Sequence, residues 1–135
     1  MPVWQSATDD PNTVYWKVDL GADFIVTQMF YDVQKYIDFV EQCRKNDIHV
    51  PIIPGLKPIT SSKQLVSLPK LFHIDVPEAL SEAVSSCKSE AEVKELGIEW
   101  MIHQCQELLK IGAPVLHFYT MSNPGPTKKI AEAIF

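Results

Sequence analysis

The stretch Gly21–Asp32, GADFIVTQMFYD, decides the fold because it has the pattern of a helix end followed by a strand. Gly21 is suited to end a helix in the left-handed conformation, and the apolar run from Phe24 to Gln28 predicts a short buried strand. In parallel sheets, side chains just beyond the carboxyl end of a strand line the ligand site. Gln28 stands there, and its amide both donates and accepts hydrogen bonds, which suits the edge of a heterocycle. The simpler alternative is that it only satisfies loop backbone.

The composition is that of an ordinary globular domain. The chain has 135 residues, 46% of them hydrophobic and 21% charged, with a net charge of −5. This acidic balance argues against nucleic acid as a partner, because phosphate contacts need clustered Lys and Arg. No apolar run approaches the roughly 18 residues of a membrane span, and the first twelve residues lack the regions of a secretory signal. We therefore expect a single domain over residues 1–135 and no membrane partner.

The cysteines and histidines show no pattern of a metal or disulfide framework. Cys43, Cys87 and Cys105 are odd in number, far apart and without a CxxC pair. This usage favours a reducing compartment, and we expect a cytoplasmic protein with inert thiols. The four histidines lack ligand-like spacing, so the sequence predicts no metal site.

Helices and strands alternate along the chain. The patterns predict helices over 11–20, 33–46, 61–68, 77–87, 90–111 and 127–135, and strands over 24–28, 50–54 and 114–119. Asp32 is the expected N-cap of the second helix, and Pro69 is expected to limit the third. Residues 1–9 are expected to be irregular. This alternation favours a parallel sheet with right-handed crossovers.

Three predicted strands do not make a closed sheet. They would leave two long unpaired edges, which natural sheets rarely tolerate, whereas a complete (β/α)8 barrel needs about 250 residues. We therefore predict an α/β fold of parallel βα units, a partial (β/α)8 TIM barrel made of its last three strands.

Four motifs in register carry a resemblance to a known family. GADFIVTQMFYD, VPIIPGLKPI, GIEWMIHQCQELL and LHFYTM resemble, in order and nearly in spacing, the catalytic domain of methylenetetrahydrofolate reductase. The resemblance covers the whole chain and implies a (β/α)8 barrel that binds FAD at the carboxyl ends of its strands. It also implies that NAD(P)H reduces the flavin, which then reduces 5,10-methylenetetrahydrofolate to 5-methyltetrahydrofolate.

The resemblance implies roles for residues on the substrate side of such a site. Gln28 corresponds to the family's glutamine that hydrogen-bonds the folate pterin, and the aromatic at Phe30 or Tyr31 to a ring of the same pocket. Gln64 matches a glutamine near the folate and nicotinamide. Tyr119 matches an active-site tyrosine at the end of the last strand.

On the cofactor side, the resemblance implies that the helix before the Gln28 strand contacts FAD. Lys17 resembles a lysine that reaches the FAD phosphates or ribose, and Asp10 and Thr13 lie within two turns before it on the same face. The alternative for Lys17 is a solvated helix charge. The family's general acid lies on earlier strands, so no catalytic residue is assigned here.

The end of the last strand departs from the family pattern. Asn123 in HFYTMSN stands where the family commonly has an arginine able to pair with the folate or its tail, so a hydrogen bond is kept but a charge is lost. The PGPTKK turn, with Gly125 and Thr127, also has the elements of a phosphate site, which barrels place after their last strands. A Pro-Gly turn with a threonine cap is the simpler interpretation.

Three hypotheses of function follow. The leading one is part of an FAD-dependent methylenetetrahydrofolate reductase, with a folate substrate and NAD(P)H. The second is a truncated, non-catalytic chain that pairs through its strand edges with a full-length subunit, with the missing barrel portion or with itself as a homo-oligomer. The third is an unrelated phosphate-binding α/β enzyme that uses the last loop.

Overall fold

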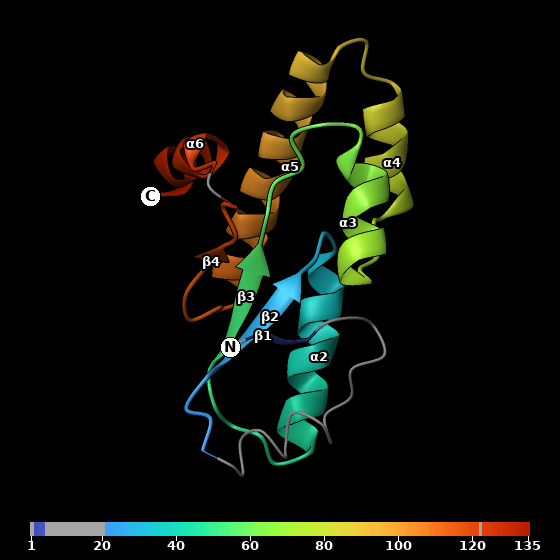
Figure 1. Cartoon of the computed structure of the whole chain (residues 1–135). Helices are drawn as coiled ribbons and strands as arrows, with labels where there is room; N and C mark the ends of the chain where they lie inside the picture. Colours follow the sequence, from blue (N-terminus) through green and yellow to red (C-terminus); the bar gives the residue numbers. More distant parts are fainter. Residues whose placement is uncertain (1, 5–20, 122) are drawn as a thin grey trace.

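A computed structural model of the chain describes residues 2–4, 21–121 and 123–135 (Figure 1). Its described strands form one parallel sheet, made of β1 (Pro2–Trp4), β2 (Ile25–Met29), β3 (Ile52–Leu56) and β4 (His117–Phe118). Their order in space, β1-β2-β3-β4, follows the order in the chain. Each crossover therefore adds a strand on the same side, and all the carboxyl ends lie at one edge of the sheet (Figure 1).

Strand β1 corrects the sequence prediction for the start of the chain. Pro2–Trp4 was expected to be irregular, but it pairs in parallel with β2, so the described sheet has four strands and not three. Three residues are too few to show the period-two alternation by which a strand is recognised. The helix expected over 11–20 lies outside the described residues.

The described helices are α2 (Val33–Lys45), α3 (Gln64–Phe72), α4 (Glu78–Ser85), α5 (Glu90–Lys110) and α6 (Gly125–Ile134). Helix α2 lies beside the strands, and α3 and α4 lie beyond their carboxyl ends, with α5 and α6 packed together (Figure 1). The bounds predicted for α2 and α5 are confirmed to within a residue. Side chains mark both starts, since Asp32 accepts a hydrogen bond from the Gln34 amide and Ser89 from that of Glu92.

Pro69 does not end α3, which was expected to stop near residue 68. The helix continues to Phe72 with Pro69 inside it and ends at His73, whose φ of 53° is left-handed. Leu68 is buried in the core, and the tertiary contact holds the second turn in place. Pro69 removes one intrahelical hydrogen bond, a cost that packing can offset.

The strands are displaced from their predicted bounds. β2 begins one residue late, β3 lies two residues later than 50–54, and β4 keeps only two of the six residues over 114–119. Pro54, expected at the end of its strand, lies inside β3. The ladder between β2 and β3 is irregular opposite Pro54, so the missing N–H is tolerated there.

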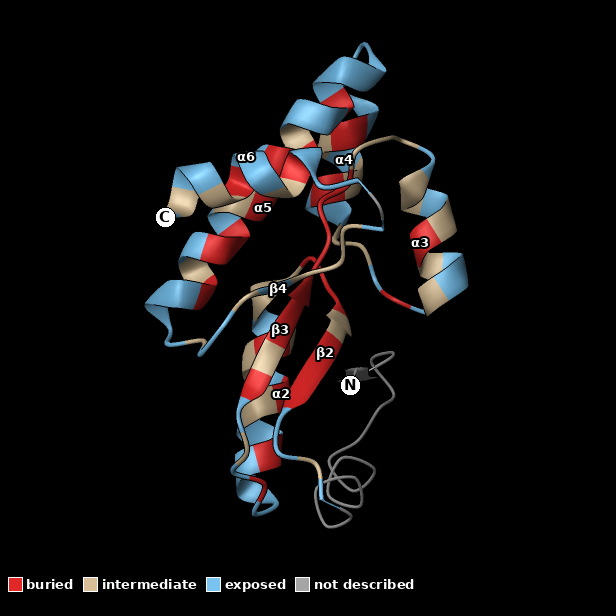
Figure 2. Cartoon of the chain, turned by 60° about the vertical axis from the view of Figure 1, so that its left-hand side comes forward, coloured by how far each residue is buried: buried red, intermediate tan, exposed pale blue. Residues whose placement is uncertain are grey.

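The core lies between the sheet and the helices, and the helices turn their buried sides toward it (Figure 2). Its fully buried side chains come from both central strands and from the helices that cover them, and include Ile25, Met29, Ile52, Leu56, Met101 and Leu108. Burial of this apolar surface is what holds the sheet and helices together. Ligand sites of parallel sheets lie outside such a core, at the carboxyl ends of the strands.

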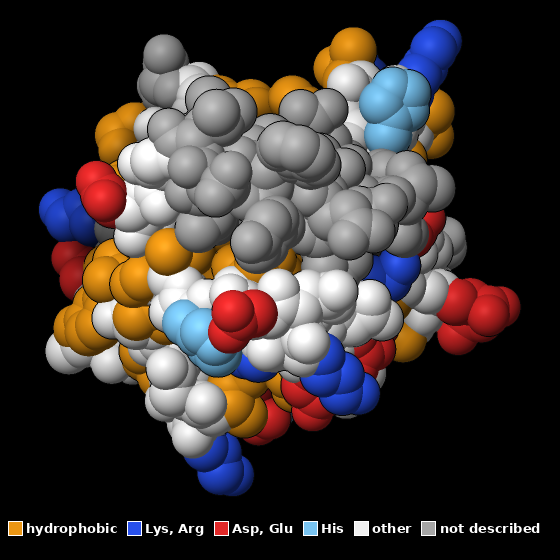
Figure 3. Space-filling model, turned by 90° about the horizontal axis from the view of Figure 1, so that it is seen from below, with side chains coloured by type: hydrophobic (Ala, Val, Ile, Leu, Met, Phe, Trp, Pro, Cys, Tyr) orange, Lys and Arg blue, Asp and Glu red, His pale blue; other side chains and the backbone are white. Residues whose placement is uncertain are grey.

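The face at the amino ends of the strands carries no dominant charge in its described part. Figure 3 shows Lys and Arg side chains interspersed with Asp and Glu and with hydrophobic groups. Among the described helices, none combines the length and apolarity that a membrane span requires.

Candidate functional site

A β-bulge marks the carboxyl end of β2. Thr27 and Gln28 together stand opposite the single residue Pro54 of β3. Side chains supply hydrogen bonds here, because Thr27 Oγ1 accepts from the Gly55 amide at 2.9 Å and Gln28 Oε1 from the Met29 amide at 3.1 Å. Bulges redirect side chains and are common next to ligand sites. The sequence left open that Gln28 only satisfies loop backbone, and its bond to the Met29 amide is a role of that kind. The bond leaves the Nε2 donor of this half-buried side chain for other partners.

Tyr119 crosses from the end of β4 to this bulge. Its hydroxyl donates to the Thr27 carbonyl at 2.8 Å, and its amide donates to the Leu56 carbonyl at 2.8 Å. Gly55 makes room for the ring, since a Cβ there would lie 2.6 Å from Tyr119 Cε2. Burial raises the pKa of Tyr119, which further favours the protonated form that donates this hydrogen bond. Tyr119 is thereby held at both ends, and its hydroxyl is bound to the residue that precedes Gln28.

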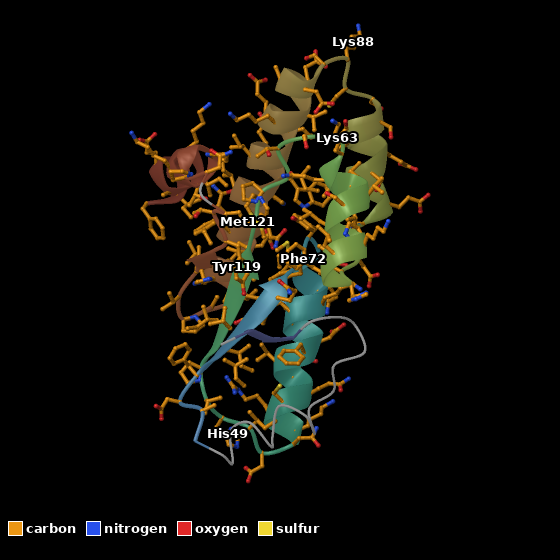
Figure 4. All side chains as sticks on the ribbon, viewed as in Figure 1. His49, Lys63, Phe72, Lys88, Tyr119 and Met121 are labelled. Atoms are coloured by element: carbon orange, nitrogen blue, oxygen red, sulfur yellow. The ribbon has the colours of Figure 1, made fainter. Side chains whose placement is uncertain are left out.

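A pocket of about 380 Å³ opens beside Tyr119 at the carboxyl ends of β3 and β4. Figure 4 shows Tyr119 and Met121 on one side of this region and Phe72, from α3, on the other; all three line the pocket. Its polar lining includes Lys57, Thr60, Gln64, Tyr119, Asn123 and Thr127. Small-molecule sites usually measure about 300–1,000 Å³, so the pocket is large enough for part of a cofactor or substrate.

Gln64 lies in this pocket, at the first residue of α3. Its Oε1 accepts from the Thr60 amide at 2.7 Å and from the Thr60 hydroxyl at 3.4 Å. These bonds fix the plane of the carboxamide. Among the described residues no partner takes the Nε2 hydrogens, so they are the group that Gln64 can offer to a ligand.

Lys57 is a pocket residue that was not expected from the sequence. It follows β3 directly and is only 8% exposed. Burial lowers the pKa of this lysine. A cation immediately after a strand covered on both faces was the signal in VPIIPGLKPI that could have revealed it. Asn123, the departure noted in the sequence, lines the same pocket.

Phe30, whose ring was expected to face the substrate, does not line this pocket. It is 2% exposed and stacks on Tyr36 of α2, with ring centroids 5.8 Å apart and planes 8° apart. Tyr31, the other aromatic considered, is also buried, at 2% exposure. Both rings enter the core because the chain turns inward after the bulge of β2.

Helix α5 holds that inward turn in place. Gln104 Nε2 donates to the Phe30 carbonyl at 3.0 Å, and Trp100 Nε1 donates to the Tyr31 carbonyl at 3.1 Å. Both partners are backbone carbonyls beyond the end of β2, so the two side chains supply hydrogen bonds to buried backbone there. The helical spacing of Trp100 indicates a packing role, but it gives no sign of these long-range bonds.

The cofactor residues expected from the resemblance cannot be placed. Asp10, Thr13 and Lys17 lie outside the described residues. Within the described part of the chain, no group of three or more His, Cys, Asp or Glu side chains could hold a metal ion. The structure therefore places Gln64 and Tyr119 in one pocket and Gln28 at the adjoining bulge, whereas Phe30 lies in the core.

Comparison with known proteins identifies relatives of this chain. The family model described as Methylenetetrahydrofolate reductase matches residues 2–134. Methylenetetrahydrofolate reductase 1 of Schizosaccharomyces pombe is 39% identical over 119 residues, which are 87% of this chain and 20% of that protein. Methylenetetrahydrofolate reductase (NADH) 1 of Arabidopsis thaliana is 38% identical over 107 residues, 78% of this chain and 18% of that protein.

A bacterial relative is covered more fully. 5,10-methylenetetrahydrofolate reductase of Escherichia coli (strain K12) is 30% identical over 122 residues, which are 90% of this chain and 41% of that protein. The chain thus spans about a fifth of the length of these eukaryotic relatives and about two fifths of the bacterial one.

Proposed function

The chain belongs to the methylenetetrahydrofolate reductase family, and we propose that it carries the folate side of an active site of that kind. The observation that supports this most directly is the family match over residues 2–134. The position of Gln64 and Tyr119 in one pocket at the carboxyl ends of parallel strands supports it independently. We also propose that β1 to β4 are consecutive strands of a (β/α)8 barrel, in which neighbouring strands follow chain order.

The proposed reaction is the reduction of 5,10-methylenetetrahydrofolate to 5-methyltetrahydrofolate with NAD(P)H. FAD, when bound, supplies the hydride chemistry between the two substrates. Flavin and pterin rings both need paired donors and acceptors along an edge, and the amides of Gln28 and Gln64 fit that requirement. Asp10, Thr13 and Lys17 remain the residues proposed to hold the rest of the cofactor.

The described residues would bind and orient the folate. Gln28 and Gln64 each have Oε1 fixed by an N–H of their own loop, so their Nε2 donors are held in defined directions. Tyr119 supports the same region by holding the Thr27 carbonyl. The described lining contains no carboxylate, so we assign no carboxylic acid of this pocket as a proton donor.

A flavin assay tests the proposal. The purified chain is incubated with FAD and passed through gel filtration, and its visible spectrum is followed during addition of NADH or NADPH and then of the folate substrate. We expect flavin absorbance to travel with the protein, to bleach with the nicotinamide and to return with the folate. Gln28→Leu should slow the return and leave the bleaching unchanged. A folded chain whose reduced flavin reacts with a quinone but not with the folate would contradict the proposal.

The exposed edge of the sheet favours a second candidate function, association without catalysis. β1 and β4 are the outer strands of the described sheet. Val115, beside the outer strand β4, is 55% exposed. Unpaired strand edges with apolar neighbours are surfaces on which another chain can pair. Light scattering over a range of concentrations tests this: a mass that rises with concentration, and falls to the monomer in Val115→Lys, supports association, whereas a constant monomer mass contradicts it.

A further inference from the structure

The pocket beside Tyr119 is lined by a lysine that has no partner among the described residues. Lys57 is 8% exposed and lines the pocket. No ion pair or hydrogen bond connects its ammonium group to any residue that the structure describes. The partial burial of the lysine side chain disfavours its charged form, and the lowered pKa of Lys57 reflects this. A lysine that lines a pocket and has no partner among the described residues points to a ligand of opposite charge.

The rest of the described lining is neutral. Its polar side chains are those of Thr60, Gln64, Ser67, Tyr119, Thr120, Asn123 and Thr127, and it contains no Asp or Glu. Hydroxyl and amide groups can all donate hydrogen bonds. Lys57 therefore meets no competing carboxylate inside the pocket, and the surrounding groups can donate to the same ligand.

The amino end of α6 adds to the positive potential. Pro126 and Thr127, at the second and third residues of this ten-residue helix, line the pocket, and of the two only Thr127 has a backbone N–H. The first N–H groups of a helix lack intrahelical acceptors and carry the positive end of the helix dipole. Together with Lys57, which directly follows β3, this gives the pocket two separate sources of positive potential.

We propose that Lys57 binds an oxyanion, a carboxylate or a phosphate, carried by the ligand of this pocket. The Nε2 group of Gln64, the side chain of Asn123 and the amino end of α6 surround the same space and can bind the remaining oxygens. The inference rests on the proposed function only for the source of the oxyanion. Within that function it is either a carboxylate of the glutamate tail of a folate or a phosphate of the nicotinamide cofactor.

Two small probes separate these sources. 4-Aminobenzoyl-glutamate carries the tail carboxylates without a pterin, and ADP carries phosphates without a nicotinamide. Binding of each to the full chain is measured by calorimetry for the wild type and for Lys57→Met, Lys57→Arg and Lys63→Met. Lys63 is exposed and does not line the pocket, so it is the matched control for loss of a lysine charge.

We expect one probe to bind and its affinity to fall roughly tenfold or more in Lys57→Met, since hydrogen bonds to charged groups are among the stronger ones. Lys57→Arg should keep most of the affinity, and Lys63→Met all of it. In the wild type, the bound probe should raise the pKa of Lys57, followed through its ε-carbon resonance in isotope-labelled protein, and leave the Lys63 resonance unchanged.

Two outcomes would overturn the proposal. One is equal affinity of the wild type and Lys57→Met for the probe that binds, and the other is binding of neither probe by folded wild-type chain at millimolar concentration. Circular dichroism monitors folding, and Lys57→Met should melt no lower than the wild type because it removes an unpaired charge. Since neither probe contains a pterin or a flavin, failure here and failure of the flavin assay are separate results.

Discussion

The backbone of Ile59 lies so close to Gly97 of α5 that no side chain fits between them. A Cβ added to Gly97 would lie 1.6 Å from the Ile59 carbonyl oxygen and 2.7 Å from its carbon. Ile59 immediately precedes Thr60, whose amide and hydroxyl hold the Oε1 of Gln64. The close approach of α5 to residue 59 therefore sets the position of one wall of the pocket.

Gly97→Ala should be strongly destabilising. The added methyl meets backbone, which cannot rotate away as a side chain can, so α5 or residues 58–60 must shift. We expect a loss of about 3 kcal/mol in the free energy of unfolding, measured by urea titration. Glu99→Ala, at an exposed position of the same helix, is the control and should change it by less than about 0.5 kcal/mol. Equal midpoints for the two variants would show that the close approach is absent.

Tyr119→Phe and Tyr31→Phe should have opposite effects. The Tyr119 hydroxyl donates to the Thr27 carbonyl, so its removal takes a hydrogen bond from a buried acceptor and should cost about 1–2 kcal/mol of unfolding free energy. The Tyr31 hydroxyl is buried and has no hydrogen-bond partner among the described residues, so its removal should be neutral or stabilising. The same urea titration measures both. A larger loss in Tyr31→Phe than in Tyr119→Phe would reject this assignment of the two hydroxyls.

The buried thiol of Cys43 should make stability fall at alkaline pH. Burial raises the pKa of Cys43 from 9.0 to about 11, so between these values the unfolded chain has lost a proton that the folded chain keeps. The unfolded state then binds fewer protons, and unfolding becomes easier as pH rises through this window, with the full stabilisation present below pH 9. Between pH 9 and 11, the free energy of unfolding should fall by about 2–3 kcal/mol less in Cys43→Ala than in the wild type. Parallel pH profiles for the two proteins would contradict this.

The three cysteines should differ in reactivity toward a thiol reagent. Cys43 and Cys105 are 0% exposed, whereas Cys87, after α4, is only half-buried. Modification requires access of the reagent to the sulfur, so Cys87 should react first under native conditions and the other two only when the chain opens. Mass spectrometry of peptides after a short exposure to iodoacetamide identifies the modified residue. Early labelling of Cys105 would mean that α5 is less protected than the structure shows.

Much of the fold follows from local sequence signals. Asp32 and Gly112 mark helix ends that the structure retains, with Asp32 accepting from the Gln34 amide and Gly112 at a φ of 91° after α5. Such signals act between neighbours in the chain, so they can be recognised without knowledge of the fold. Strand β1 has no such local signal, because a three-residue strand is stabilised by its pairing with β2, which is a contact between distant segments.

The site was only partly visible in the sequence. Gln64 and Tyr119 were expected at the substrate and lie in one pocket, whereas Phe30 was expected there and lies in the core. Lys57 was not selected, because a lysine after a strand is ordinary until its burial is known. Whether a side chain lines a pocket depends on which distant elements pack against it, and residue type alone does not decide that.

By itself, the sequence determined the parallel α/β class, the start and end of the long helices and the membership of the family, because caps, helical spacing and aligned motifs are properties of the chain. Only the tertiary structure decided that Lys57, Gln64 and Thr127 share one pocket, and that the ring of Tyr119 reaches β2 across Gly55. These groupings arise from packing between segments far apart in the chain, where burial removes water and gives each polar group its partner or leaves it unpaired.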